Sequence, residues 1–298
     1  MRVLISGASG LVGTEVARQL LARGDEPVLL VRRTAKGSNE IEWHPDRHEI
    51  AKGALEDIDA VVNLAGATTG KIPWTKSYKN EIVRSRLDST LTLVTAINAS
   101  ERKPKVFVSG SASGFYGDTG SKVLTEADPK GAGFLADLAA QWEQTAAGVD
   151  PSVRLVLART TMVLSRRLGA LGRLLPLLRL GVGGPLGSGK QFWAWISVVD
   201  EAGAILHLID TQSASGAYNL TAPEPATCKQ LVNQLGKSLH RPTLLPVPAF
   251  ALRLFLGQAA DELLLCSQNM SAEKLLASGY RFAHPTLKSA TDWVVAKN

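Results

Sequence analysis

Short apolar runs alternate with stretches of helical periodicity from the N-terminus to about residue 160. The apolar runs predict strands at residues 3–6, 27–32, 59–64, 106–108 and 153–158. The stretches between them predict helices at residues 11–23, 76–99 and 134–147. Continuous apolar strands that alternate with helices favour a parallel sheet covered on both faces.

The pattern changes after Arg159. A Gly-Pro-rich loop at residues 181–189 precedes a predicted helix at 200–210 and a predicted strand at 217–220. A capping-box pattern from Thr227 to Gln230 marks the start of another helix. Three more helical stretches follow, around residues 248–256, 271–278 and 285–296. We therefore expect the C-terminal third to form a smaller, helix-rich lobe.

A glycine triple stands between the first predicted strand and the first predicted helix, in the order Gly7-Ala8-Ser9-Gly10-Leu11-Val12-Gly13. The first glycine permits a tight turn, the second lets the backbone approach a pyrophosphate, and the third lets the helix pack on the strand. The free N–H groups and partial positive charge of the helix N-terminus then favour phosphate. The alternative is a glycine-rich turn without a ligand.

These features together predict an α/β fold with a Rossmann-type doubly wound parallel sheet and a smaller helix-rich C-terminal substrate lobe. We place the dinucleotide-binding domain at residues 1–165, completed by about 198–222. The substrate lobe then comprises residues 166–197 and 223–298.

The end of the second predicted strand carries Val31-Arg32-Arg33 and no acid. An acid at this position binds the ribose 2′-hydroxyl of NAD, whereas arginine accommodates the 2′-phosphate of NADP. Guanidinium suits phosphate by charge and by its fork of donors. The arginines therefore favour NADP(H), and the alternative is that both are solvated surface residues.

Composition narrows the class of protein further. The 298 residues are 45% hydrophobic and 20% charged, an ordinary soluble globular mix. No apolar run reaches the ~18 residues of a membrane span, and Met1 and Arg2 lead directly into a strand rather than a secretory signal. The net charge of +6 comes from Lys and Arg scattered among acids, so an anionic cofactor explains it better than nucleic acid or a membrane.

Cysteine and histidine residues give no sign of a metal site. The two cysteines, Cys228 and Cys266, fit no zinc spacing and no disulfide framework, so we expect a cytoplasmic protein. His207, His240 and His284 are isolated and are more simply surface or hydrogen-bonded core residues. A homodimer is one assembly that the sequence allows.

Three segments together carry a family resemblance: Gly7–Gly13 with its glycine triple, Asn63-Leu64-Ala65-Gly66, and residues 109–118 (Ser-Gly-Ser-Ala-Ser-Gly-Phe-Tyr-Gly-Asp). They resemble the extended short-chain dehydrogenase/reductase superfamily. More narrowly, the chain is similar to an atypical branch of NAD(P)-dependent epimerase/dehydratase-like proteins, often of unknown substrate. Residues 180–189, with Gln191 and Trp195-Ile196, are the most specific part of a match that covers essentially the whole chain.

The resemblance implies a cofactor site and the residues that form it. It places NADP(H) near Gly7, Ser9, Gly10, Leu11 and Val12. It also implies contacts from residues on later elements, namely Arg32, Arg33, Leu64, Ala65, Gly66, Glu81, Arg86, Ser109, Arg159, Thr160 and Met162.

Typical members of the superfamily use a Ser and a Tyr-x-x-x-Lys pair, in which Tyr is the general acid/base and Lys lowers its pKa. In this chain Phe134 aligns with the Tyr and Leu138 with the Lys, and neither can transfer a proton. Ser111 and Tyr116 are the substitutes that we predict to be catalytic, although Tyr116 is also interpretable as a structural or substrate-lining residue. Glu143 is more simply a surface or capping residue.

The loop at 181–189 has two interpretations. It is either a flexible lid over the substrate cleft, with Lys190 and Gln191 as polar contacts and Trp193 and Trp195 as a flat binding wall, or a packing turn between lobes. We favour the lid. The function expected is an NADP(H)-binding oxidoreductase or epimerase acting on a small polar molecule, and a nucleotide-sugar is one candidate. The alternative is an NADP(H)-binding sensor or regulator that has lost catalysis.

Overall fold

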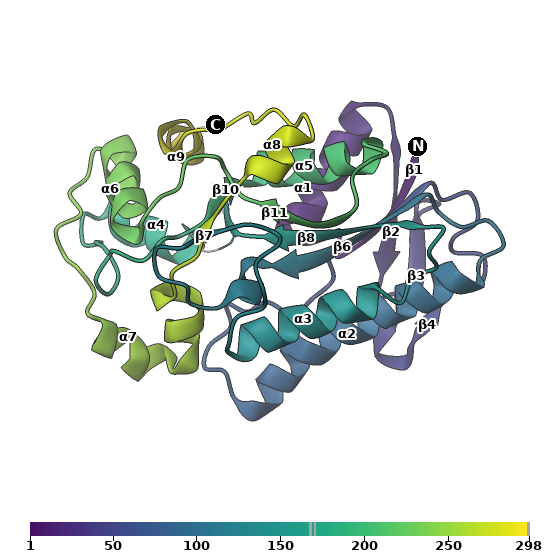
Figure 1. The fold of residues 1–298 in the computed structure, drawn as a ribbon, viewed down its shortest axis with the longest axis horizontal. Coiled ribbons are helices and arrows are strands. Elements are labelled where there is room, and N and C mark those ends of the chain that lie inside the picture. The colour runs from purple at the N-terminus through teal and green to yellow at the C-terminus, as the bar shows by residue number, and fades with distance from the viewer. Residues whose placement is uncertain (167–168, 170, 297–298) are drawn as a thin grey trace.

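An eight-stranded sheet forms the centre of the molecule in the computed structural model, which describes residues 1–166, 169 and 171–296 (Figure 1). All neighbouring strands are parallel except the last pair, which is antiparallel. In spatial order the strands are β11 (Gly216–Leu220), β8 (Arg154–Thr160), β6 (Val106–Ala112), β5 (Ala60–Asn63), β1 (Arg2–Ser6), β2 (Glu26–Val31), β3 (Glu40–His44) and β4 (Glu49–Ile50).

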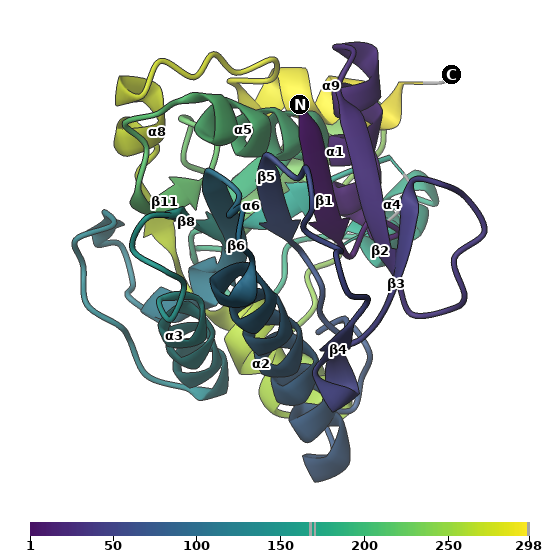
Figure 2. The same cartoon turned by 90° about the vertical axis from the view of Figure 1, so that its right-hand side faces the viewer.

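Helices cover both faces of this sheet (Figures 1 and 2). One face carries α1 (Leu11–Ala22) and α5 (Val198–Asp210), and the other carries α2 (Lys76–Ala99) and α3 (Phe134–Ala146). Alternate residues of β1 enter the two resulting cores: Val3 and Ile5 pack on the side of α1 and α5, and Leu4 packs on the opposite side. The predicted doubly wound parallel sheet is therefore confirmed.

The direction in which the sheet grows reverses between β1 and β5. The chain moves outward from β1 through β2 and β3, and then returns to add β5, β6, β8 and β11 on the other side. In sheets of this kind ligands bind at the carboxyl ends of the strands, in the crevice beside this switch point. The glycine turn between β1 and α1 lies at that place.

The C-terminal part of the chain adds a helix-rich lobe around a second core that contains Trp193 and Trp195. The predicted capping box is confirmed, because Thr227 and Gln230 cap each other at the start of α6. The predicted domain limits remain predictions. The lobe comprises α4 (Leu171–Arg179), α6 (Cys228–Leu239), α7 (Ala249–Leu256), the π-helical turn η3 (Ala260–Leu265), α8 (Glu273–Ala277) and α9 (Leu287–Val295).

Several short elements go beyond the predicted pattern, because segments of two to four residues carry too little periodicity to be recognised. They include the 3-10 turns η1 (Pro45–Arg47) and η2 (Ser113–Tyr116). Two small parallel pairs join distant segments: β9 (Met162–Leu164) with β10 (Trp195–Ser197), and β7 (Val123–Leu124) with β12 (Asn269–Met270). Helix α4 was also not predicted, and it carries Pro176 inside it. None of the described helices is long and apolar enough to cross a membrane.

Candidate functional site

Two of the three glycines in the β1–α1 turn are required by the fold itself. Gly7 has φ +71°, and a Cβ there would lie 2.6 Å from the carbonyl oxygen of Leu64. A Cβ on Gly13 would lie 2.3 Å from the carbonyl oxygen of Gly7. Both positions therefore need glycine so that α1 and β5 can approach the turn closely.

Gly10 is different, because a Cβ there would have one near neighbour, the Gly7 oxygen at 3.1 Å. Its backbone N–H donates to that same oxygen at 2.9 Å. Gly10 is the N-cap of α1 and supplies no side-chain cap, so the first N–H groups of the helix have no capping oxygen from this residue. Together with the exposed Ser9 and the half-buried Leu11 and Val12, it forms a backbone surface suited to a pyrophosphate.

A buried row of hydrogen bonds between side chains of β1, β5, α2 and α3 supports the glycine turn. Ser6 donates to Asn63 at 2.6 Å, and Asn63 donates to Thr90 at 2.8 Å. The indole N–H of Trp142 donates to the same Thr90 hydroxyl at 2.8 Å. The backbone N–H of Ala65 reaches Ser6 at 3.3 Å, so the strand end that leads to Leu64 and Ala65 is fixed from β1 and α2.

Arg86 on α2 packs against Gly66, directly after β5. A Cβ on Gly66 would lie 3.1 Å from the guanidinium carbon, and one guanidinium nitrogen donates to the carbonyls of Ala67 and Ile82. Burial lowers the pKa of Arg86 to about 10, and no ion pair of Arg86 occurs within the described residues. This half-buried cation lies beside the switch point. Glu81, in contrast, is exposed on the same helix.

The two arginines after β2 differ in their partners. Arg33 forms a double hydrogen bond with Glu40 on β3, at 2.6 and 2.8 Å, and its charge is therefore already balanced. Arg32 is exposed and forms no hydrogen bond or ion pair with any other described residue. The pattern of residues alone could not separate the two, whereas the described contacts leave Arg32 as the free cation of the pair.

Ser111, at the carboxyl end of β6, belongs to a buried ionic network. Its hydroxyl donates to Glu143 of α3 at 2.6 Å, and Glu143 receives two hydrogen bonds from Arg159 of β8, at 2.8 and 2.9 Å. The Arg159 side chain is 5% exposed and that of Glu143 11%. Glu143 is therefore a buried partner of Arg159 rather than the surface or capping residue that we expected.

Tyr116 of η2 belongs to the same network, because its hydroxyl links Arg159 to Asn219. Its hydroxyl accepts from Arg159 at 2.8 Å and donates to Asn219 of β11 at 2.7 Å. Burial raises the pKa of Tyr116. Burial alone would lower the pKa of Arg159, but the hydrogen bonds and charge of Glu143 outweigh it and raise that pKa.

These contacts support positioning roles for Ser111 and Tyr116, because both hydroxyls are bonded to protein groups and both side chains are buried. Their predicted catalytic roles remain predictions. Ser109 is fully buried within β6, and its hydroxyl reaches only the carbonyl of Gly110, at 3.3 Å, among the described residues. A cofactor contact through the Ser109 side chain is likewise still a prediction.

Phe134 and Leu138 lie in an apolar cluster between α3 and α2. Phe134 meets Trp74 edge to face with ring centroids 5.5 Å apart, and the buried Leu138 joins Tyr78 and Ile82 in the same cluster. In this chain the two positions therefore contribute packing between helices and no proton relay.

Thr160 and Met162 lie where β8 passes into β9. The Thr160 hydroxyl donates to Glu201 of α5 at 2.6 Å. Glu201 is fully buried, and its second carboxyl oxygen has no hydrogen-bond partner within the described residues. Burial raises the pKa of Glu201 to about 8, against the opposing effect of Thr160, so the carboxyl is protonated at neutral pH.

Because Glu201 is protonated in the folded protein, we expect the free energy of unfolding to depend on pH. Between the ordinary carboxyl pKa of 4.5 and the folded value of about 8, the native state keeps a proton that the unfolded state releases, so stability falls as pH rises through this window. We expect Glu201→Gln to raise the melting temperature by several degrees at pH 8, and the gain to shrink toward pH 4.5. Thermal unfolding across this range measures it, with the exposed Glu81→Gln as control. A wild-type-like pH profile for the Gln variant would contradict it.

The loop at 181–189 is a packing turn, and our preference for a lid over bound substrate is not supported. Gly187 N–H donates to Val247 O at 2.8 Å, and a Cβ on Gly184 would lie 2.3 Å from the Leu245 oxygen. Gln191 is bonded to the carbonyls of Leu186 and Leu264, both at 3.0 Å. The segment at residues 245–247 thus packs against the part of the loop from Gly184 to Gly187.

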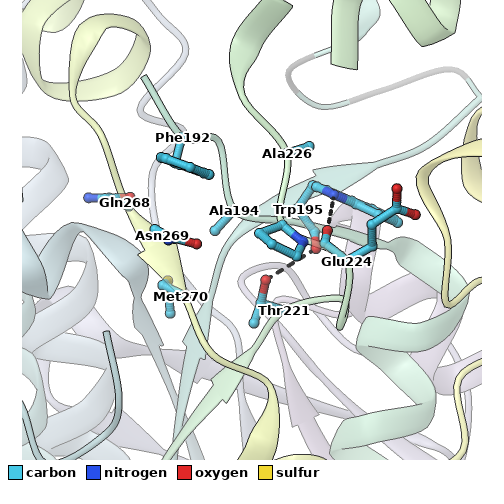
Figure 3. A pocket seen from close by; sticks show the side chains of 10 residues that line it. Phe192, Ala194, Trp195, Thr221, Glu224, Ala226, Gln268, Asn269 and Met270 are labelled. Carbon is cyan, nitrogen blue, oxygen red and sulfur yellow. Dashed lines mark hydrogen bonds between the residues drawn. The ribbon is translucent and has the colours of Figure 1, made fainter. Parts of the chain in front are cut away.

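The two tryptophans beside this loop are core residues. Trp195 is 1% exposed and donates its indole N–H to the carbonyl of Glu224 at 3.0 Å, a contact drawn in Figure 3. Trp193 is 5% exposed and donates to Leu264. The recess in Figure 3, lined by Phe192, Trp195 and Met270 among others, is too tight to admit a water molecule. The tryptophans therefore do not form a flat binding wall.

The comparisons with known proteins agree with this geometry. The sequence profile of the NAD dependent epimerase/dehydratase family matches residues 3–221. The chain belongs to this family. A second profile, described as a domain of unknown function (DUF1731), matches residues 247–294, within the helix-rich lobe.

Members of the epimerase/dehydratase family that resemble this chain include an epimerase family protein of Mycobacterium leprae, 38% identical over 296 residues, 99% of this chain and 96% of the relative. The crystal structure of the human epimerase family protein SDR39U1, with NADPH, has a TM-score of 0.93 at 33% identity and covers 99% of each chain. A nucleoside-diphosphate sugar epimerase of Corynebacterium glutamicum has a TM-score of 0.79 at 30% identity, over 97% of this chain and 57% of that one.

Proposed function

We propose that this family member binds NADP(H) and acts as an oxidoreductase or epimerase on a small polar substrate. The observation that carries the proposal is the pairing of an uncapped glycine turn at Gly10 with the free cation Arg32 on the neighbouring strand end. A 2′-phosphate needs such a cation, and a pyrophosphate needs such a turn. The human relative, whose structure contains NADPH, supports the choice of cofactor.

Cofactor preference tests this proposal, and the two arginines provide a matched pair. We expect wild type to bind NADPH roughly tenfold to a hundredfold more tightly than NADH, since a charge-assisted contact contributes ~1.5–3 kcal/mol. Arg32→Ala should remove most of this preference. Arg33→Ala should remove less, because Arg33 is already paired with Glu40. Calorimetric titration of both cofactors measures the ratio, and equal dissociation constants in wild type would refute the proposal.

Ser111 and Tyr116 remain the proposed catalytic residues, and the buried Glu143–Arg159 pair is the proposed support that orients them. Phe134 and Leu138 provide no proton donor at the positions that align with the superfamily's Tyr and Lys. Tight NADPH binding without turnover of any alcohol, aldehyde or sugar would favour the alternative of a catalytically degraded sensor or regulator.

The same proposal includes the expected setting of the protein. We propose a cytoplasmic location and a small-molecule partner rather than nucleic acid or a membrane, on the basis of the scattered charges and the anionic cofactor. We leave open a homodimer as its assembly.

A further inference from the structure

A cavity of about 210 Å³ lies between the sheet domain and the helix-rich lobe. Its wall on one side comes from η2 and the first turn of α3, including Gly114, Leu135 and Ala136. The opposite wall comes from α7, η3 and the segment that follows, and it includes Arg253, Glu262 and Gln268. The cavity is therefore bounded by the same turn and helix that follow β6 and that carry Tyr116 and Phe134.

The N-terminus of α3, which would attract an anion, is already occupied by a carboxylate of the protein. Gly133 precedes the helix and provides no side-chain cap. The backbone N–H groups of Phe134 and Leu135 donate instead to the two oxygens of Glu262, at 3.1 and 2.7 Å. Because Glu262 neutralises this helix end, a phosphate or carboxylate on a ligand gains nothing there.

Besides Glu262, the charged residues of the lining are two carboxylates and one guanidinium. Arg253 is paired with Asp261 at 2.9 Å, which leaves no free cation among the described residues of the lining. Asp118 also lines the cavity, and one of its oxygens accepts the Ser267 N–H at 3.1 Å. Three carboxylates against one guanidinium give the lining a net negative charge, which opposes the entry of a diphosphate.

Two side chains of the lining, Gln268 and Asp118, carry acceptor oxygens without a hydrogen-bond partner in the described part of the chain. Gln268 is 9% exposed and donates its amide to the carbonyl of Gly117 at 3.2 Å, but its own carbonyl oxygen has no hydrogen-bond partner within the described residues. The second oxygen of Asp118 is also without one in that part of the chain. A ligand that satisfies these groups must donate hydrogen bonds, as hydroxyl and ammonium groups do.

The volume of the cavity also limits the size of the ligand that it can hold. Drug-sized ligands occupy pockets of roughly 300–1,000 Å³, and this cavity is smaller. It suits a molecule about the size of a single sugar ring and is too small for a whole nucleoside-diphosphate sugar.

Resting on the proposed cofactor function, we infer that this cavity binds the substrate, and that the substrate is a small polyol or amino alcohol without phosphate or carboxylate groups. The acidic lining, the occupied helix end and the unpaired acceptors all favour a neutral or cationic donor of hydrogen bonds. On this inference a nucleoside-diphosphate sugar, which the name of the Corynebacterium relative attaches to that protein, is not the ligand of this cavity.

Three sugars of similar size but different charge test the inference: glucosamine, glucose and glucose 1-phosphate. Each is titrated into the NADP⁺-loaded protein and followed by ligand-observed NMR, with UDP-glucose as competitor. We expect glucosamine to bind at least as well as glucose, and glucose 1-phosphate to bind roughly tenfold more weakly, a ratio that corresponds to ~1.4 kcal/mol. UDP-glucose should not displace glucosamine.

Asp118→Asn should reduce severalfold the ratio between the dissociation constants of glucose 1-phosphate and glucosamine. The control is Asp137→Asn, which removes an exposed carboxylate of α3 outside the lining. Glucose 1-phosphate or UDP-glucose binding more tightly than glucosamine would overturn the inference, and so would binding of none of the sugars. If the protein instead fails to bind NADP⁺ at all, the proposed function fails, so the two failures are distinguishable.

Discussion

Replacing Gly10 with valine should abolish cofactor binding while the protein stays folded. An added Cβ meets one near neighbour, the Gly7 oxygen at 3.1 Å, which must shift by a few tenths of an ångström to accept it. Valine also fills the space through which a pyrophosphate must approach the helix N-terminus. We expect NADPH affinity to fall by more than roughly a hundredfold, equivalent to ~2.7 kcal/mol. Circular dichroism and a binding titration on the same preparation measure both properties.

Gly13 supplies the matched comparison. A Cβ on this residue would lie 2.3 Å from the Gly7 oxygen, against 3.1 Å for a Cβ on Gly10, so even Gly13→Ala should lower the melting temperature more than Gly10→Val does. A folded Gly10→Val protein with normal NADPH affinity would show that the turn is not the phosphate site.

Glu143→Gln should destabilise the protein far more than the loss of a carboxylate from its surface. The substitution leaves the buried Arg159 guanidinium without its counter-ion, and removing one partner of a buried pair costs about 3–5 kcal/mol. Urea unfolding measures the free energy directly. Arg159→Met combined with Glu143→Gln should recover part of the loss, because no unpaired charge is then buried.

An exposed pair serves as the control for this prediction. Arg102 and Asp57 are 68% and 69% exposed, so Asp57→Asn should change the free energy of unfolding by less than ~1 kcal/mol. Equal losses from Glu143→Gln and Asp57→Asn would mean that the buried network contributes no more than a surface contact.

The fold was predictable where the signal is local. Helix α2 has the predicted bounds, and the Thr227–Gln230 capping box forms as expected, since both depend on residues that are close in sequence. The sheet followed from continuous apolar strands such as β1, whose alternate residues enter two cores. The tryptophans at 193 and 195 were misinterpreted because aromatic residues beside a glycine loop have the same pattern whether they line a cleft or a core.

The candidate site was predictable only in part. The glycine turn was visible because its three glycines lie within seven residues. The Glu143–Arg159 pair, the free state of Arg32 and the cap that Glu262 places on α3 depend on contacts between residues far apart in the chain. No local period marks such residues, although a glutamate and an arginine in otherwise apolar elements are a signal worth testing for a buried pair.

Strand β11 and Glu262 both come late in the chain, and this order has a consequence for folding during synthesis on the ribosome. The nascent chain exposes the outer edge of β8 until β11 (Gly216–Leu220) emerges to pair with it, and α3 stays uncapped until Glu262 follows. Domains generally fold from the N-terminus as they emerge, and an unpaired strand edge recruits other chains. We therefore expect a chain truncated before residue 216 to aggregate more readily than the whole chain, and native folding to finish only after Glu262 has emerged.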